Sequence, residues 1–393
     1  MPSFQIEKSI LNQVGTTNNE LNANLSFLIL VLISILIFGI VGNVISIFIF
    51  GKKKMRASPT LRFLLYLSVV DLFVLMMGIS EILLKSGFSF GLRDSSLFVC
   101  NIQKFIGYSS TYISSLLSVA VNIYRAKKVS YLFHLNTEIN KTKRVRFKKT
   151  IDQTNSLVDS ITKFVIIFVF LLNSHFIFLL KSSHVVYFED DLKLLKLNET
   201  QINSYDVFSC VPFQNSFYEK FLVHAWFWID LLLYSLIPLI SMTICSIIII
   251  VNLMKLNRGY STRLDLNSSS FTKRIYSRKL RKNIQISLIL ICSNGYFFIT
   301  TVIFWTWFSI VDKEFLDENF GTYFKRSLVY TLLYSNNAFG ILFYGLFSTQ
   351  YRRHLIGLPG CNFFCREFML SSSVQVQLKE NTSLKGAIDP TIT

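Results

Sequence analysis

Long apolar runs constrain this chain more than any other feature. Seven stretches are each long enough to cross a bilayer as a helix, which takes about 20 residues. They lie near residues 26–50, 61–84, 100–124, 161–180, 222–252, 284–310 and 326–347. The sequence therefore predicts an all-α membrane protein, a bundle of seven transmembrane helices.

Composition supports a membrane protein. Of the 393 residues, 51% are hydrophobic and 16% are charged, and the mean hydropathy is +0.46. A soluble domain carries about 25% charged residues. The net charge of +17 could indicate nucleic-acid binding, but the basic residues cluster in short loops between the apolar runs. Such loops are typical of the cytoplasmic side of a membrane protein, so we expect membrane lipid and no nucleic acid as a partner.

The same loops predict the orientation. The loop after the first run contains Lys52, Lys53, Lys54 and Arg56, and further basic clusters follow the third and fifth runs. An excess of Lys and Arg places these three loops in the cytoplasm. The N-terminus is then extracellular and the C-terminus cytoplasmic. The sequons at Asn24 and Asn198 fall on the outer side and are candidate glycosylation sites.

These patterns divide the chain into four expected parts. Residues 1–25 form an extracellular N-terminal segment, which is polar and does not look like a removed signal peptide. Residues 26–348 form the seven-transmembrane domain. Residues 349–368 form a short amphipathic juxtamembrane helix, and the polar, Ser-rich residues 369–393 form a disordered cytoplasmic tail.

Certain polar residues recur at particular depths of the apolar runs. The third run begins at Cys100 and ends at Arg125, roughly 37 Å apart on a helix. The other runs contribute Asn43 to the first, Asp71 to the second, Pro238 to the fifth and Tyr344 to the seventh. In this order, over about residues 26–368, the chain resembles the rhodopsin-like (class A) G-protein-coupled receptors, in a divergent, neuropeptide-receptor-like form.

The resemblance implies a receptor at the plasma membrane. It would bind an extracellular ligand, with a neuropeptide as the expected class, and activate a heterotrimeric G protein through Arg125 and Tyr344. In the family, an aspartate at the position of Asp71 holds a sodium ion with polar groups that Ser114 and Asn336 match here, close to Asn43. The alternative is a structural aspartate that is hydrogen-bonded to Asn43 and Asn336, without sodium. We expect no other metal and no cofactor.

The resemblance also pairs Cys100 with Cys210. These are the two of the six cysteines expected on the oxidising outer side, and the alternative is two free thiols. Cys361 and Cys365 follow the juxtamembrane stretch, where such receptors are often palmitoylated.

Residues near the outer ends of the runs suggest a ligand pocket. It would include Gln103, Gly107, Trp228, Trp305 and Tyr334. Gly107 occupies the position at which amine receptors carry an aspartate, which argues against an amine ligand. For the aromatic residues the alternative is the belt that marks a membrane interface.

The chain also departs from the family pattern around its expected switch. The family's Asp-Arg-Tyr reads Tyr124-Arg125-Ala126, and its Asn-Pro pair reads Gly340-Ile341. Without the acidic neighbour, Arg125 lacks the usual ionic restraint, so we expect raised basal activity. The alternative is an interfacial arginine whose head reaches toward water.

Other function classes have weaker signals. No metalloprotease, Walker or hydrolase motif appears, so we expect no enzyme. A chemosensory receptor for small molecules would share this architecture. A channel or transporter would need a polar pathway, for which only Asp71 and His175 lie at mid-membrane depth in the sequence.

Overall fold

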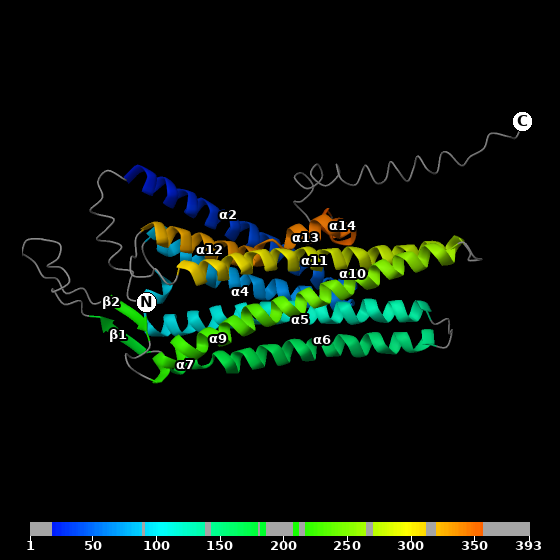
Figure 1. The fold of residues 1–393 in the computed structure, drawn as a ribbon, viewed down its shortest axis with the longest axis horizontal. Helices are drawn as coiled ribbons and strands as arrows, with labels where there is room; N and C mark the ends of the chain where they lie inside the picture. The colour runs from blue at the N-terminus through cyan, green and yellow to red at the C-terminus, as the bar shows by residue number, and fades with distance from the viewer. Residues whose placement is uncertain are drawn as a thin grey trace, which may run out of the picture.

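The computed structural model describes residues 18–88, 91–137, 143–179, 181–185, 207–211, 217–264, 270–311 and 320–356. These residues form a bundle of long helices with a pair of short strands at one end, called the β end below (Figure 1). In chain order the elements are α2 (Asn18–Gly51), α3 (Lys53–Arg56), α4 (Pro59–Phe88), η1 (Leu92–Asp94), α5 (Leu97–Thr137), α6 (Lys143–Asn173), α7 (His175–Phe178), β1 (Lys181–Val185), β2 (Val207–Val211), α8 (Phe217–Lys220), η4 (Phe221–Trp226), α9 (Phe227–Asp230), η5 (Leu231–Leu236), α10 (Ile237–Leu264), α11 (Ser270–Val311), α12 (Phe320–Ala338), α13 (Gly340–Phe347) and α14 (Thr349–Ile356).

Helices occupy all seven ranges predicted from the sequence, but their composition divides them. Five are long and apolar enough to cross a membrane: Asn24–Gly51, Pro59–Phe88, Asn155–Phe178, His224–Leu256 and Asn283–Trp307. Among the described residues, α5 and α12 do not reach this apolarity. The prediction of an apolar, membrane-compatible helical bundle is confirmed, whereas five candidate spans, not seven, are found by length and composition.

The position of α5 explains its lower apolarity. It contacts α4, α6, α7, α10 and α11 as well as β2, and no residue between 99 and 122 is exposed. Its hydroxyl and amide side chains therefore face protein and not the surroundings. In α12, Lys325 and Leu328 are the exposed side chains among residues 324–338. A helix enclosed by other helices does not need an apolar surface on every side.

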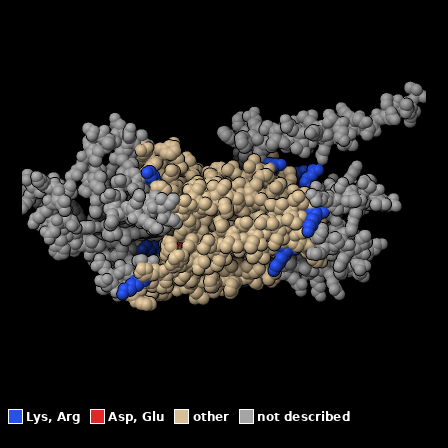
Figure 2. Space-filling model, viewed as in Figure 1, with Lys and Arg blue, Asp and Glu red and all other residues tan. Residues whose placement is uncertain are grey.

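The outer helices have the opposite pattern. Phe164 and Leu171 of α6 are 69% and 71% exposed, and Phe48 of α2 is 65% exposed. Figure 2 shows a broad surface with few charges along the sides of the bundle, with the visible Lys and Arg near its two ends. An exposed apolar surface of this extent is compatible with a protein embedded in a membrane.

The two strands pair antiparallel and were not predicted. Ser182 of β1 lies opposite Cys210 of β2, and β2 contacts η1 and α5. Together with α7, which follows α6, they form the β end of the bundle (Figure 1). The all-α prediction is therefore right for the bundle, with this small strand pair as an addition.

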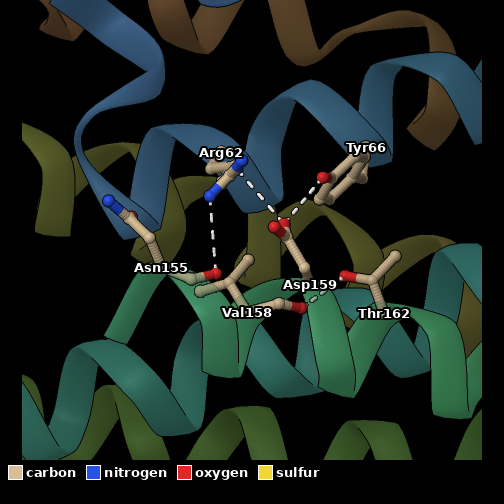
Figure 3. Close-up of polar contacts among 6 residues, drawn as sticks. All are labelled: Arg62, Tyr66, Asn155, Val158, Asp159 and Thr162. Carbon is tan, nitrogen blue, oxygen red and sulfur yellow. Dashed lines mark hydrogen bonds and ion pairs between the residues drawn. The ribbon is translucent and has the colours of Figure 1, made fainter. Parts of the chain in front are cut away.

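An ion pair joins α4 to α6 (Figure 3). Arg62 Nε lies 3.2 Å from Asp159 Oδ1, and the Tyr66 hydroxyl donates to the same oxygen at 2.7 Å. Arg62 Nη1 also donates to the backbone oxygen of Asn155 at 3.4 Å. Since both charged side chains are partly exposed, the pair contributes about 0–1 kcal/mol, and its main effect is to fix how α6 lies along α4.

Helix α14 lies at the other end of the bundle, next to α13 and the end of α2. Its Tyr351 is fully buried, and its hydroxyl shares a 2.9 Å hydrogen bond with Ser46 of α2. Burial and the nearby ammonium groups of Lys52 and Lys54 lower the pKa of His354. The predicted juxtamembrane helix therefore exists over Thr349–Ile356, and the rest of the predicted range 349–368 lies outside the described residues. At the other boundary α2 begins at Asn18, ahead of the predicted residue 26.

Glycines let α2 approach the seventh helix closely. A Cβ added at Gly39 would lie 2.5 Å from Leu75 Cδ1 and 2.9 Å from Ala338 Cβ. A Cβ at Gly295 of α11 would meet nothing within 4 Å.

We therefore predict opposite effects for two glycine substitutions. Gly39→Ala should lower the free energy of unfolding by about 1–3 kcal/mol, because the neighbouring helices must move to admit the methyl group. Gly295→Ala should be neutral or raise it by up to about 1 kcal/mol through helix propensity. Thermal unfolding of both full-length variants in nanodiscs measures this, and equal midpoints would contradict the close packing.

Candidate functional site

A buried carboxylate joins three helices in the middle of the bundle. Asp71 Oδ1 accepts hydrogen bonds from Ser114 Oγ and from Asn337 Nδ2, both at 2.7 Å. Asn337 Nδ2 also lies 3.0 Å from Ser114 Oγ, and Asn43 Nδ2 donates to the backbone oxygen of Asn337 at 2.9 Å. We call Asn43, Asp71, Ser114 and Asn337 the Asp71 core. A carboxylate is costly in an apolar interior, and these donors reduce that cost.

The Asp71 core contains three of the four predicted residues. The sequence prediction named Asn336, but the neighbouring Asn337 donates to Asp71 instead, and Asn336 Oδ1 is buried without a hydrogen-bond partner. One residue along a helix turns the side chain by about 100°, so only one of two adjacent asparagines can face Asp71. For a sodium ion, Asp71 and Ser114 offer oxygen atoms, whereas Asn337 presents its N–H group. Within the described residues no group of three or more His, Cys, Asp and Glu side chains could hold a metal ion.

Arg125 lies further along α5 and is fully buried. Its Nη2 donates to the backbone oxygen of Asn283 at 2.8 Å and to Ser287 Oγ at 2.9 Å. Its Nη1 lies 3.5 Å from Asn283 Oδ1, a weak contact. Three contacts with neutral groups thus tie this guanidinium to α11. An arginine this buried is not the interfacial arginine of the alternative interpretation, whose charged head would reach water.

A pair of asparagines joins the same two helices between Asp71 and Arg125. Asn294 Nδ2 donates to Asn122 Oδ1 at 2.8 Å, and Asn122 Nδ2 donates to Asn294 Oδ1 at 3.1 Å. Asn294 Nδ2 also donates to Ser246 Oγ of α10 at 2.9 Å. Beside the pair is a cavity of about 20 Å³, lined also by Tyr344 and Gly340. That volume has room for about one water molecule.

Tyr344 packs away from Arg125. Its ring lies 5.1 Å from the ring of Phe50 and 5.6 Å from that of Tyr351, measured between centroids. Among the described contacts none joins Tyr344 to Arg125. The two residues predicted to contact a G protein are therefore held by different neighbours, α2 and α14 for one and α11 for the other.

Two of the predicted pocket residues have other contacts near the β end. Gln103 Nε2 donates to Glu81 Oε2 at 2.7 Å, and the backbone N–H of Leu92 donates to the same oxygen at 3.1 Å. Gly107 faces α4, since its ideal Cβ would lie 3.8 Å from Met77 Cβ.

The three predicted aromatic residues separate. Trp228 is 59% exposed and lies on the outside of the bundle. Trp305 packs edge-on against Phe227. Tyr334 stacks on Tyr330, and its ring closes directly on Gly78. Tyr334 and Trp305 thus face protein, whereas the environment of Trp228 fits the alternative of an interfacial belt.

Asp230, an acidic residue near the predicted pocket residues, was not predicted from the sequence. Asp230 ends α9, and Tyr112 of α5 donates to its Oδ1 at 2.7 Å. The signal was a lone acid in an apolar run, Phe227-Trp228-Ile229-Asp230-Leu231. The resemblance to the receptor family draws attention to the position of Gly107 and not to this acid. His175, by contrast, lies in α7 near the β end and not at mid-depth, and it shares a 2.8 Å hydrogen bond with Tyr218.

Some of the remaining predicted sites lie within the described residues and others do not. Cys100 is buried and disulfide-bonded, and β2, which carries Cys210, contacts its helix. The pairing of Cys100 with Cys210 stays a prediction, since the Cys210 side chain is not described. Asn24 is exposed on α2. Asn198, Cys361 and Cys365 lie outside the described residues.

The two adjacent asparagines of α12 offer a direct test of the Asp71 core. Asn337→Ala removes both of its hydrogen bonds to Asp71 and Ser114, so it should lower the free energy of unfolding by about 1–3 kcal/mol. Asn336→Ala is the matched control and should lower it by less than about 0.5 kcal/mol. Thermal unfolding in nanodiscs compares them, and a larger loss for Asn336→Ala would restore the original assignment.

No protein-family model matches this sequence, and no curated protein matches it. The function is therefore argued from the side chains and contacts described above.

Proposed function

We propose that this chain is a seven-transmembrane receptor of the rhodopsin-like class at the plasma membrane. It binds an extracellular ligand, a neuropeptide, near the β end and activates a heterotrimeric G protein at the opposite end. In this proposal α5 and α12 also cross the membrane, α5 among α4, α6 and α10, and α12 among α2, α4 and α11. The N-terminus is extracellular, and the basic loops face the cytoplasm and anionic lipid.

The observation that carries the proposal is the buried Arg125. A guanidinium that is fully enclosed and held by neutral partners is expensive for a purely structural role. A site that can switch explains it better. Every described hydrogen bond of this side chain goes to α11, so a displacement of α11 would release all of them together.

The proposed switch follows from this geometry. With α11 in place, Asn283 and Ser287 accept hydrogen bonds from Arg125. If a ligand favours an arrangement in which α11 has moved, the guanidinium becomes available to a G protein. Asn294 couples this movement to the interior, since it bonds both Asn122 of α5 and Ser246 of α10.

The contacts at the β end support a site for an external ligand. The disulfide at Cys100 and the contact between α5 and β2 fix the start of α5, and β2 is paired with β1. Near them, Gln103 Oε1 and Trp226 Nε1 are buried without hydrogen-bond partners. Buried polar atoms are normally satisfied, so these groups favour a bound molecule at this end. They fit a small chemosensory ligand as well as a peptide.

A channel or transporter is less well supported. Such a protein needs a lined polar pathway, and the cavity beside Asn122, with a volume of about 20 Å³, has room for about one water molecule. An ion current from the purified protein in a planar bilayer, without any G protein, would favour that alternative.

Expression of the full chain in cultured cells tests the receptor proposal. A neuropeptide library should evoke calcium or cyclic-nucleotide responses, and Arg125→Ala should abolish them while surface expression is kept. Responses to small odorant molecules alone would support the chemosensory alternative. No response to either set, together with a ligand-evoked current, would overturn the proposal.

The contacts of Arg125 also predict the basal activity. Ser287→Ala removes a hydrogen bond to a charged group from the closed arrangement, so ligand-independent signalling should rise by about two- to tenfold. Leu288→Ala, on the exposed face of the same turn, is the matched control and should change nothing. Tyr124→Asp should lower basal signalling, because it places an acid beside the guanidinium. Second-messenger accumulation at equal surface expression measures all three, and an unchanged Ser287→Ala would contradict the restraint.

A further inference from the structure

Asp230 is a second inward-facing carboxylate, and the function proposed above does not use it. It belongs to a membrane-compatible helix, and its hydrogen-bond partner Tyr112 is 1% exposed, so the carboxylate points into the bundle. Tyr112 binds Oδ1, and no hydrogen bond to Oδ2 is described. Asp230 itself is half-buried. One carboxylate oxygen therefore remains open to another partner.

The protein supplies no cation to this carboxylate in the described part of the chain. The ion pairs described there join Arg62 to Asp159 and Lys85 to Glu81. Arg93 of η1 and Arg326 of α12 lie within electrostatic range of Tyr108 and Tyr330, but neither is among the groups that act on Asp230. An ionised carboxylate inside a bundle is normally paired, so its counter-charge is to be sought outside these residues.

Tyrosines of three elements lie in the neighbourhood of the same carboxylate. Five tyrosines lie within electrostatic range of Asp230: Tyr108 and Tyr112 of α5, Tyr234 of η5, and Tyr330 and Tyr334 of α12. Trp226 lies one turn before Asp230, and its ring centroid is 6.3 Å from those of both Tyr108 and Tyr112. A carboxylate with aromatic side chains nearby is an environment that suits an ammonium or guanidinium group.

An unsatisfied donor lies beside these tyrosines on Trp226, whose ring also lies 4.3 Å from that of His175 between centroids. Trp226 is 5% exposed, and its Nε1 has no hydrogen-bond partner. Further toward the β end, Gln103 is 3% exposed, and its Oε1 has no partner either. Tyr334 lies within electrostatic range of both Asp230 and Glu81, so these groups border one region. An orphan donor and an orphan acceptor beside a charged group suit a ligand that carries amide groups next to its cation.

We propose that Asp230 pairs with a cationic side chain of the ligand, a guanidinium or an ammonium held among these tyrosines. The inference rests on the proposed receptor function and names the chemical class of its ligand, a basic peptide. The positive charge meets Asp230 Oδ2, while Tyr112 keeps Oδ1 in position. The ligand charge thus enters from the fifth-helix side, although the third-helix position used for amines is Gly107.

A pair of probes that differ only in charge tests the site. N-acetyl-Phe-Arg-amide carries the guanidinium, and N-acetyl-Phe-citrulline-amide replaces it with a neutral group of similar shape. The full-length chain in nanodiscs is titrated with each, with tryptophan fluorescence as the readout because Trp226 and Trp305 flank the region. The arginine probe should bind at least about tenfold more tightly, as expected for a hydrogen bond between charged groups.

Variants then show which residue is responsible for the preference for the arginine probe. Asp230→Asn keeps an acceptor for Tyr112 and should reduce the preference to within about twofold. Asp159→Asn, which removes a carboxylate that pairs with Arg62 elsewhere, is the matched control and should leave the preference intact. Tyr112→Phe keeps the Asp230 charge, so it should also retain the preference. If Asp230→Asn does not fold, Asp230→Ser takes its place, since it also removes the charge, and a preference that survives it would overturn the cation site.

The outcomes separate this inference from the receptor proposal. Equal affinity of the wild-type chain for the two probes, or a preference that survives Asp230→Asn, would overturn the cation site. A preference that depends on Asp230, in a chain that never activates a G protein with any peptide, would uphold the site and contradict the receptor function. Binding in nanodiscs needs no G protein, so the two results are independent.

Discussion

The polar surface of α5 is the constraint on which the rest of the structure depends. Serine, threonine, asparagine and arginine side chains along one helix have no partners in lipid, and each unpaired group would cost several kcal/mol. The helix is therefore enclosed, and every neighbour supplies a polar group or packs against it. Ser114 meets Asp71 of α4, and Ser115 donates to the backbone oxygen of Tyr234. The apolar helices could pack in several ways, but α5 restricts them to an arrangement in which its hydrogen bonds are made.

The sequence predicted the elements well where composition alone decides. An uninterrupted apolar run defines a spanning helix, which is why the ranges of α2 and α4 were found. It predicted side-chain direction poorly, because direction depends on helix phase, and one residue changes that phase by about 100°. Asn336 was chosen where Asn337 faces Asp71, and Trp228 was placed in a pocket although it points outward. Both errors concern rotation about the helix axis, which apolar composition does not fix.

The sequence pointed to Arg125 and not to Asp230, but it did not show the hydrogen-bond partners of either residue, for one reason. Arg125 was found because the family position marks it, but its partners on α11 were not predictable from a motif that has lost its acid. Asp230 was missed because no motif marks it. In both cases the informative fact is the partner: Tyr112 for the carboxylate, and Asn283 with Ser287 for the guanidinium. Partners come from helices more than 100 positions away in the chain, and no local pattern brings them together.

The neutral partners of Arg125 have a consequence for the energetics of a switch. An acidic partner would attract the guanidinium through the Coulomb energy in a low dielectric and would be left as a buried charge when the contact broke. Serine hydroxyl and backbone carbonyl groups carry no net charge, so if α11 moves as proposed, the guanidinium is the one charge left without its partners, and no buried carboxylate remains on α11. With such contacts in place of an ion pair, the free-energy difference between the closed and open arrangements of the proposed switch would be smaller. A narrower gap would make the proposed equilibrium sensitive to small contributions, including a single charge pair at the proposed Asp230 site, whose partner Tyr112 belongs to the same helix as Arg125.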